Sequence, residues 1–412
     1  MEKVEQLITE EIDSYVLNLA EREDGSESIS GESIQIAPVF NGEVEELLNG
    51  QNGFAWVVTL FKHDNLELAK VVTFDEDALD SQIDQLNCMQ ASEQREPVDA
   101  TVSAYTADGY SLVPADYGTT IENTFKKAVE DSILVLADEL DLDEADCYVK
   151  PEIEDDNEKL LAVIDEMNSY VGTTITYDFD VAKEVLDGER ISEWISVDDD
   201  LNLVVDEEGV LSFVKELASE YNTCYKPKEL KTSYGSTVTI SNGPYGWKIN
   251  NSEEVAQILD DLKAGKKVER EPVYAQTANS HGENDYGNSY VEINLTAQHL
   301  WYYKDGKLTM ESDIVSGYPS KSRNTPGGVY KLWYKEKGKT LRGSADGQSY
   351  ASYVDYWNNV STIGIGLHDA SWQNGNFGGE RYKSSTWGSH GCINMPLDKA
   401  KYVYEKIDMG TP

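Results

Sequence analysis

The sequence predicts a multidomain protein in which two α+β domains are followed by a mainly-β domain, expected to be a β-sandwich. The chain has 412 residues, too many for one compact domain and enough for two or three. Hydrophobic residues make up 40% of the chain, so each domain can bury a core. The charge changes near Tyr290, because the first 289 residues carry 20 basic and 64 acidic side chains and the remainder carries 14 and 12. This change predicts a domain boundary.

The net charge of −42 excludes one class of function. A protein this acidic is repelled by the phosphate backbone of nucleic acids and by anionic lipid headgroups. We therefore expect no nucleic-acid partner. The sequence also contains no run of about 20 apolar residues, the length that spans a bilayer.

Residues 1–150 contain both helix and strand patterns. Apolar side chains between Glu5 and Leu19 recur at steps of three and four, which predicts an amphipathic helix. The runs Val57–Phe61 and Val71–Phe74 are rich in β-branched and aromatic residues and predict strands. These patterns together indicate an α+β domain.

A weak internal repeat predicts that residues 151–280 form a second copy of this domain. A strand, a turn, a glycine followed by an aromatic residue, and a helix occur twice in the same order. The first set is Thr101–Tyr105, Gly109-Tyr110 and Ile121–Leu136, and the second is Thr237–Ile240, Gly246-Trp247 and Glu253–Leu262. Duplicated domains explain this order better than a solenoid of short repeats. The charged stretch Pro151–Asn157 is expected to link the copies.

Residues 289–412 follow a polar linker and have a different pattern. The alternation of Val291, Ile293 and Leu295 predicts a half-buried strand. Further short strands, separated by Gly, Pro, Asn and Ser turns, are expected at Leu300–Tyr303, Ile314–Val315, Val329–Tyr334 and Ile363–Leu367. This spacing is typical of an all-β sandwich or barrel. One helix is expected, at Leu397–Ile407.

The densest group of reactive side chains lies in the segment from Gly364 to Pro396. His368, His390 and Cys392 fall within 24 residues (392 − 368), although the whole chain has five histidines and four cysteines. A thiolate is the reactive form of cysteine, and a nearby imidazole that accepts the thiol proton can supply it. We therefore expect Cys392 to be a nucleophile with a histidine as its base.

The residues beside the cysteine suit acyl transfer. Gly391 permits a φ above zero or the close approach of a substrate backbone. The main-chain amides of Gly391 and Cys392 are expected to donate hydrogen bonds to an oxyanion. Asn394 is expected to brace the turn through its side chain.

Other interpretations of this segment are weaker. His368, His390 and Cys392 could bind zinc, but a catalytic zinc normally has three ligands with ordered partners behind them, so we expect no metal and no other cofactor. A lone cysteine is often a small buried hydrophobic residue. The tripeptide Ser280-His281-Gly282 repeats part of the motif without a cysteine, and we attribute it to chance. Both histidines precede Cys392, an order that excludes a papain-like fold.

Two motifs resemble those of the YkuD-type L,D-transpeptidases, a family of bacterial cell-wall enzymes. They are Gly366-Leu367-His368-Asp369 and Ser389-His390-Gly391-Cys392-Ile393-Asn394. Further agreement comes from Val291–Leu295, Gln298–Tyr303 and Thr325–Tyr330. The resemblance covers roughly residues 290–412. The acidic region before it is similar to the peptidoglycan-binding domains that precede such enzymes in Gram-positive bacteria.

The resemblance implies a reaction on peptidoglycan stem peptides, which act as donor and acceptor. Cys392 would attack the carbonyl of the third stem residue and release D-Ala, and an amine of a second stem would take the thioester. His368 would be the base, oriented either by the backbone carbonyl of Asp369 or by the hydroxyl of Ser389. His390 would line the pocket, and carbapenems would acylate the thiol. Two alternatives stay open: an L,D-carboxypeptidase that uses water as acceptor, and a wall-binding scaffold with an inactive catalytic domain.

Aromatic side chains near the motifs suit a groove for a stem peptide. They are Tyr353, Tyr356, Trp357, Trp372 and Trp387, each of which could equally be a core residue. The stretches Gly343–Ser352 and Asn374–Gly379 are expected to be mobile flaps over the cleft.

The ends of the sequence depart from the family pattern. Family members are extracytoplasmic and anchored by an N-terminal membrane helix, and their catalytic domain usually continues past Gly410-Thr411-Pro412 into one more apolar strand. We therefore expect a soluble fragment of an extracytoplasmic, membrane-anchored protein, the anchor being absent from this sequence. In an oxidising compartment Cys88 and Cys147 could form a disulfide, which would contribute ~4 kcal/mol in the chain-entropy model. Cys224 is expected to be buried or free.

Overall fold

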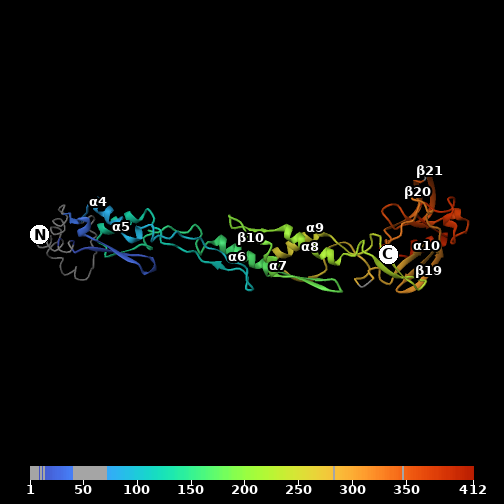
Figure 1. Ribbon diagram of the computed structural model, residues 1–412, viewed down its shortest axis with the longest axis horizontal. Coiled ribbons are helices and arrows are strands. Elements are labelled where there is room, and N and C mark those ends of the chain that lie inside the picture. The colour runs from blue at the N-terminus through green and yellow to red at the C-terminus, as the bar shows by residue number, and fades with distance from the viewer. Residues whose placement is uncertain (1–8, 10–11, 13, 40–71, 282–283, 346–347) are drawn as a thin grey trace, which may run out of the picture. The chain divides into compact units, whose positions relative to one another are not determined.

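The computed structural model describes residues 9, 12, 14–39, 72–281, 284–345 and 348–412 (Figure 1). Internal contacts divide the chain into two compact units, Met1–Asp165 and Glu166–Pro412. The division lies inside helix α6 (Glu158–Val171), whereas the sequence predicts that the first domain ends at residue 150. Among the described residues, no helix has the length and apolar character needed to cross a bilayer.

The first unit contains a three-stranded sheet in the order β2-β1-β7. Strand β1 (Val16–Ala20) is antiparallel to β2 (Ser26–Ser30) and parallel to β7 (Glu139–Asp141). Helices α4 (Glu76–Ile83) and α5 (Phe125–Leu134) share a buried core with the sheet. The remaining elements within its described residues are η1 (Arg22–Asp24), η2 (Glu32–Ile34), β3 (Ala37–Pro38), β4 (Val72–Thr73), η3 (Asn87–Met89), β5 (Thr101–Val102) and β6 (Leu112–Val113).

The helix predicted for Glu5–Leu19 is wrong over its last part. Val16–Leu19 belong to β1, where Leu17 and Leu19 are buried and Asn18 between them is exposed. Alternation with a period of two therefore outweighs the steps of three and four on which the helix prediction rested. Most of the earlier part of this range, and the whole strand predicted at Val57–Phe61, lie outside the described residues.

The second unit begins with a sheet of the same topology. Strand β8 (Thr174–Asp178) is antiparallel to β9 (Lys183–Leu186) and parallel to β15 (Lys267–Arg270). Helices α8 (Glu207–Tyr221) and α9 (Asn251–Lys263) lie side by side (Figure 1), and their N-termini are capped by the side chains of Asp206 and Asn250. The other elements are α7 (Gly188–Ser192), β10 (Ile195–Val197), β11 (Leu203–Val205), β12 (Lys228–Lys231), β13 (Thr237–Ile240), β14 (Lys248–Ile249) and β16 (Tyr274–Gln276).

The topology recurs, but the alignment of the repeat inferred from sequence is one strand out of step. Strands β5 and β6 form a hairpin with Gly109 in its turn, and β12 and β13 form a hairpin with Gly235 in its turn. Thr101–Val102 therefore corresponds to β12 and not to Thr237–Ile240, which is β13. The sequence comparison matched Gly109 with Gly246 because an aromatic residue follows each.

The C-terminal region contains two sheets that share one core. Strands β17 (Tyr290–Asn294), β18 (His299–Lys304) and β19 (Lys307–Asp313) form an antiparallel sheet. The second sheet has the order β20 (Tyr334–Ala345), β21 (Gln348–Asn359), β22 (Gly366–Asp369) and β23 (Ile393–Met395), and β20 and β21 project as a long hairpin (Figure 1). Helix α10 (Leu397–Lys406) packs on this sheet, and η4 (Ser371–Gln373) and η5 (Arg381–Lys383) are short turns.

Several strand predictions in this region are confirmed and others are corrected. Strand β17 lies where the alternation of Val291, Ile293 and Leu295 predicts it, and β18 contains the predicted short strand Leu300–Tyr303. Val329–Trp333 form no strand, because their amides bond to separate segments such as Asn242 and Thr411 rather than to one ladder. The strand predicted at Ile363–Leu367 begins at Gly366 instead. The expected flap Gly343–Ser352 consists of the facing ends of β20 and β21 on either side of residues 346–347.

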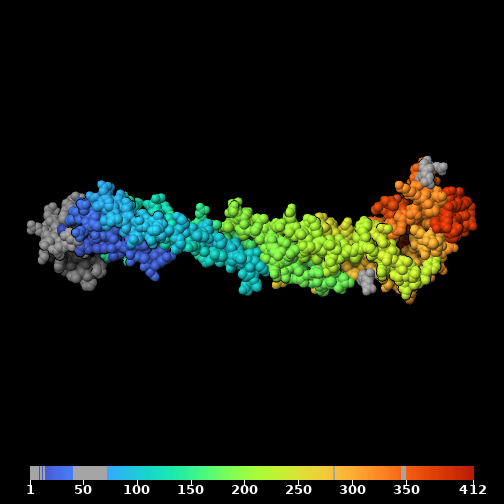
Figure 2. All heavy atoms as spheres, viewed as in Figure 1, coloured from blue at the N-terminus to red at the C-terminus, as the bar shows by residue number. Residues whose placement is uncertain are grey.

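Within the second unit, the β12–β13 hairpin packs against the C-terminal region, and Figure 2 shows yellow-green and orange atoms adjoining there. Lys228 Nζ lies 2.6 Å from Asp285 Oδ2, and the two side chains are 8% and 4% exposed. The carboxylate of Glu292 on β17 accepts hydrogen bonds from the backbone N–H and the hydroxyl of Ser233. A buried ion pair therefore joins the hairpin to the segment that precedes β17, and charged hydrogen bonds join it to β17 itself.

Candidate active site

Two neighbouring strands bring the reactive motifs together. Strands β22 and β23 run parallel, with His368 opposite Asn394, so both side chains lie on one face of the sheet. Cys392 occupies the turn that leads into β23. His368, Asn394 and Cys392, together with His390, line one cleft of about 920 Å³.

The sulfur of Cys392 is a protonated thiol near neutral pH. Its burial raises the pKa of the thiol to about 11, against a smaller lowering effect of the Gly366 backbone amide. Sγ also lies 3.8 Å from the carbonyl oxygen of Gly364. The nucleophile therefore has to lose its proton when it attacks, because the thiolate of this partly buried sulfur is disfavoured at rest.

His368 is held in one tautomer. Its side chain is 3% exposed, and Nδ1 lies 2.9 Å from the carbonyl oxygen of Asp369. A carbonyl oxygen only accepts hydrogen bonds, so Nδ1 carries the hydrogen and Nε2 keeps a free lone pair. Burial lowers the pKa of His368, so the ring is neutral.

The two groups that could orient His368 have separate partners. The backbone carbonyl of Asp369 bonds the ring, while its carboxylate accepts from the backbone amides of Asp355 and Tyr356. The hydroxyl of Ser389 does not bond the ring: it donates to the carbonyl of Cys392 at 2.5 Å and accepts from the amide of Gly391 at 3.0 Å. Of the two alternatives from sequence, the geometry favours the Asp369 carbonyl.

The backbone N–H groups of Gly391 and Cys392, both expected to donate hydrogen bonds to an oxyanion, differ in whether they already have a hydrogen-bond partner. The Gly391 N–H is already bonded to Ser389 Oγ, so it is not free for a substrate oxygen. The Cys392 N–H has no hydrogen-bond partner within the described part of the chain. Gly391 has a φ of 112°, a conformation that residues with a side chain rarely adopt, which explains the glycine.

Asn394 does not brace the turn through its amide as predicted. Its side chain is buried beside the cleft, and its Oδ1 has no hydrogen-bond partner among the described residues. The anchor is its backbone, which exchanges two hydrogen bonds of 3.0 Å with Val315. The strand ladder provides the rigidity that we assigned to the side chain.

Some of the predicted aromatic residues line the cleft and one belongs to the core, whereas Tyr353 is 61% exposed and is part of neither. Trp357, Trp372 and Trp387 line the cleft, and the rings of the first two lie 5.8 and 5.9 Å from that of His368. Tyr356 belongs to the core and packs on Tyr404, because neighbouring residues of a strand face opposite sides of the sheet. A substrate-lining role for Tyr356 is therefore wrong.

Sequence reasoning missed several residues of the cleft. Tyr350 stacks on the ring of His390 with the centroids 4.2 Å apart and the planes 8° apart. Arg323, Lys339 and Arg342 also line the cleft, and no acidic side chain is among the described lining residues. This local excess of positive charge contrasts with the acidic chain as a whole. Tyr350 lies in the stretch Gly343–Ser352, which the sequence assigns to a flap over the cleft. That assignment is the sequence signal that could have indicated a role for Tyr350 in the cleft.

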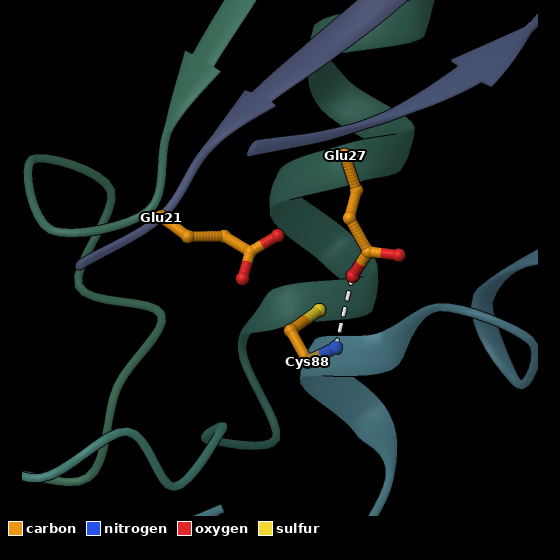
Figure 3. A group of neighbouring side chains, drawn as sticks. All are labelled: Glu21, Glu27 and Cys88. Atoms are coloured by element: carbon orange, nitrogen blue, oxygen red, sulfur yellow. Dashed lines mark hydrogen bonds between the residues drawn. The ribbon is translucent and has the colours of Figure 1, made fainter. Parts of the chain in front are cut away.

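A grouping of side chains close enough to hold a metal occurs elsewhere in the described residues, at Glu21, Glu27 and Cys88 (Figure 3). Their ligand atoms lie within 4.8 Å of one another. The carboxylate of Glu27 already accepts from the backbone amides of Asn87 and Cys88 and so caps η3. His368, His390 and Cys392 do not form such a grouping in the described residues.

The predicted disulfide is absent. Cys88 and Cys147 are free, buried thiols of the first core, and Cys224 is a free, partly buried one. Burial, with the nearby Glu21 and Glu27, raises the pKa of Cys88 to about 12, so its thiolate is scarce at neutral pH.

Comparison with known proteins identifies two parts of the chain. Residues 288–412 match the family model "L,D-transpeptidase catalytic domain" (YkuD), and residues 153–270 match "Putative peptidoglycan binding domain". A curated relative, "Probable L,D-transpeptidase 3" of Mycobacterium tuberculosis, is 30% identical over 94 residues, which are 21% of this chain and 32% of that protein. The match therefore spans about a third of the relative's length.

Two similar solved structures come from Enterococcus faecium. An L,D-transpeptidase is 33% identical, with 60% of this chain and 97% of that chain covered and a TM-score of 0.49. A catalytic domain of an L,D-transpeptidase, solved in the form acylated by ertapenem, is 45% identical, with 29% of this chain and 91% of that chain covered and a TM-score of 0.27.

Proposed function

Because residues 288–412 belong to the YkuD family of L,D-transpeptidase catalytic domains, we propose that this protein cross-links the third residues of peptidoglycan stem peptides. The observation that carries the proposal is the arrangement around Cys392. One cleft contains a thiol, a neutral imidazole with its Nε2 lone pair available, and an amide N–H that has no partner among the residues described. Acyl transfer needs these three groups: a nucleophile, a base and an oxyanion donor.

The first half of the reaction forms a thioester. Cys392 Sγ attacks the carbonyl carbon of the third residue of the donor stem, and the thiol proton passes to His368 Nε2. The electron pair of the carbonyl moves to its oxygen, where the Cys392 N–H stabilises the negative charge. When the carbonyl re-forms, the bond to the terminal D-Ala breaks, and its nitrogen takes the proton from His368.

The second half transfers the acyl group to a second stem. The side-chain amine of the acceptor attacks the thioester, and His368 Nε2 takes a proton from that amine. The thiolate leaves and takes the proton from His368 Nε2, which restores the thiol and the neutral ring. The basic and aromatic lining suits a peptide that carries carboxylates, because the cleft has cations and no acidic groups among its described lining residues.

The remaining architecture follows from the same assignment. We infer that residues 1–150 and 151–280 are two copies of a peptidoglycan-binding domain and that residues 289–412 form a β-sandwich. The recurrence of the topology β2-β1-β7 in β9-β8-β15 supports the duplication. Domains of these families indicate an extracytoplasmic location. We also propose that an additional segment attaches the protein to a membrane.

The test is the covalent adduct with ertapenem, followed by intact-protein mass. We expect an adduct on the full chain and none on Cys392→Ala. Cys224→Ala, which removes a free cysteine outside the cleft, is the matched control and should still form the adduct. Absence of any adduct would favour a wall-binding scaffold. If the adduct forms, incubation with a tetrapeptide stem and an amine acceptor separates a cross-linked dimer, the product of a transferase, from a tripeptide, the product of a carboxypeptidase.

A further inference from the structure

The turn that carries the nucleophile is held from behind by a buried hydroxyl group. Thr325 is 8% exposed, and its Oγ1 lies 2.8 Å from the carbonyl oxygen of Gly391 and 2.9 Å from the backbone nitrogen of Gly317. The Gly317 N–H can only donate, and the Gly391 carbonyl can only accept. The single hydroxyl hydrogen of Thr325 is therefore directed at Gly391.

This bond fixes the direction of the neighbouring amide. The carbonyl of Gly391 and the N–H of Cys392 belong to the same planar trans peptide, so they point in opposite directions. Thr325 lies outside the lining of the catalytic cleft, whereas Cys392 is part of it. With its carbonyl bonded to Thr325, the peptide directs the Cys392 N–H away from Thr325, and that N–H has no other partner in the described residues.

The backbone at this point does not fix the peptide by itself. Gly391 has no side chain and a φ of 112°, so its own conformation restricts rotation of the Gly391–Cys392 peptide less than that of a residue with a Cβ would. A rotated peptide would present the carbonyl oxygen, rather than the N–H, to a developing oxyanion. Two like partial charges would then face each other in the transition state.

We propose that Thr325 is a positioning residue for the acyl-transfer reaction, which sets the Gly391–Cys392 peptide so that the Cys392 N–H serves as the oxyanion donor. The inference rests on the proposed function, since it concerns the same cleft. A positioning role differs from a role in stabilising the fold in one measurable way. Loss of the Thr325 hydroxyl should slow reactions of Cys392 that form an oxyanion and leave unchanged those that do not.

Two reactions of Cys392 separate these roles. Acylation by ertapenem moves a carbonyl electron pair onto oxygen and needs the amide donor. Alkylation by iodoacetamide forms a bond from sulfur to carbon and releases iodide, so no oxyanion appears. The rates of both are measured on the full chain by intact mass and by mapping the modified peptide, together with the thermal unfolding midpoint.

Thr325→Val keeps the shape of the side chain and removes the hydroxyl, while Thr325→Ser keeps the hydroxyl. We expect Thr325→Val to lower the acylation rate by about 10- to 100-fold, with alkylation of Cys392 within about twofold of wild type. Thr325→Ser restores acylation to within about threefold of wild type. Thr325→Ala provides a second variant without the hydroxyl if the valine variant does not fold.

An unchanged acylation rate in the folded valine or alanine variant would overturn the inference. So would an equal loss of acylation and alkylation, because that pattern indicates a general distortion of the turn. If wild type itself is alkylated but not acylated, the proposed function fails, and the role of Thr325 fails with it.

Discussion

The protonation state of the nucleophile leads to a prediction about its reactivity with pH. With the thiol pKa of Cys392 at about 11, only about one molecule in 10⁴ carries the thiolate at pH 7. The rate of alkylation of Cys392 by iodoacetamide should therefore rise about tenfold per pH unit between pH 6 and 10, because the thiolate is the reacting species. A preformed thiolate–imidazolium pair would instead give a rate that is constant across this range.

The assay is a pseudo-first-order time course at each pH, with the peptide that contains Cys392 quantified separately from the other three cysteines. His368→Gln is the informative companion variant. In the resting state the neutral ring of His368 does not ionise the thiol, so we expect the alkylation profile of the variant to follow that of wild type within about threefold. Acylation by ertapenem should fall by about 10²- to 10⁴-fold, because the general base is lost.

A plateau in the alkylation rate between pH 6 and 9 would refute this reasoning. It would mean that the thiol pKa lies below the range and that the imidazole and the sulfur are charged at rest. A loss of alkylation in His368→Gln as large as the loss of acylation would contradict it as well, since the ring would then be required for the ionisation itself.

Three further predictions concern backbone strain, the buried ion pair and the cysteines. Gly391→Ala places a side chain at a φ of 112° and should cost about 1–3 kcal/mol in the free energy of unfolding, measured with urea; an unchanged midpoint would show that the strain is relieved. Lys228→Met leaves Asp285 buried without its cation and should lower stability by about 3–5 kcal/mol, whereas pairing it with Asp285→Leu should recover much of the loss; a single variant as stable as wild type would contradict this. Reductant should leave the thermal midpoint unchanged, because Cys88 and Cys147 are free; a mass difference of two hydrogens between oxidised and reduced protein would disprove it.

The catalytic motif could be predicted from the sequence because its parts are contiguous. Ser389–Cys392 form one turn that leads directly into β23, so the residue types alone indicate a nucleophile flanked by amides. The hydrogen-bond partners of that turn could not be predicted in this way. Thr325 reaches Gly391 across 66 residues, and the occupation of the Gly391 amide by Ser389 depends on one side-chain rotamer.

The strands were harder to predict from the sequence where hydrophobic and polar residues do not alternate regularly. The hairpin of β20 and β21 is largely polar and contains Gly338 and Gly343, so its sequence is typical of a loop, although its two twelve-residue strands form eleven residue pairs. The opposite error occurred at Val329–Trp333, where apolar composition predicts a strand but the chain bonds to three separate segments. In both places long-range pairing, which no local pattern encodes, decides the outcome.

The buried Lys228–Asp285 ion pair and the Ser233–Glu292 hydrogen bonds have a mechanical consequence for an enzyme whose proposed substrate, peptidoglycan, is a polymer network. They fasten the β12–β13 hairpin to the segment before β17 and to β17 itself, whose sheet shares a core with the sheet that carries the cleft. If the domain that contains this hairpin binds the cell wall, the sulfur of Cys392 reacts at a fixed distance from the point of attachment. The protein itself would then set the spacing of the cross-links that it forms.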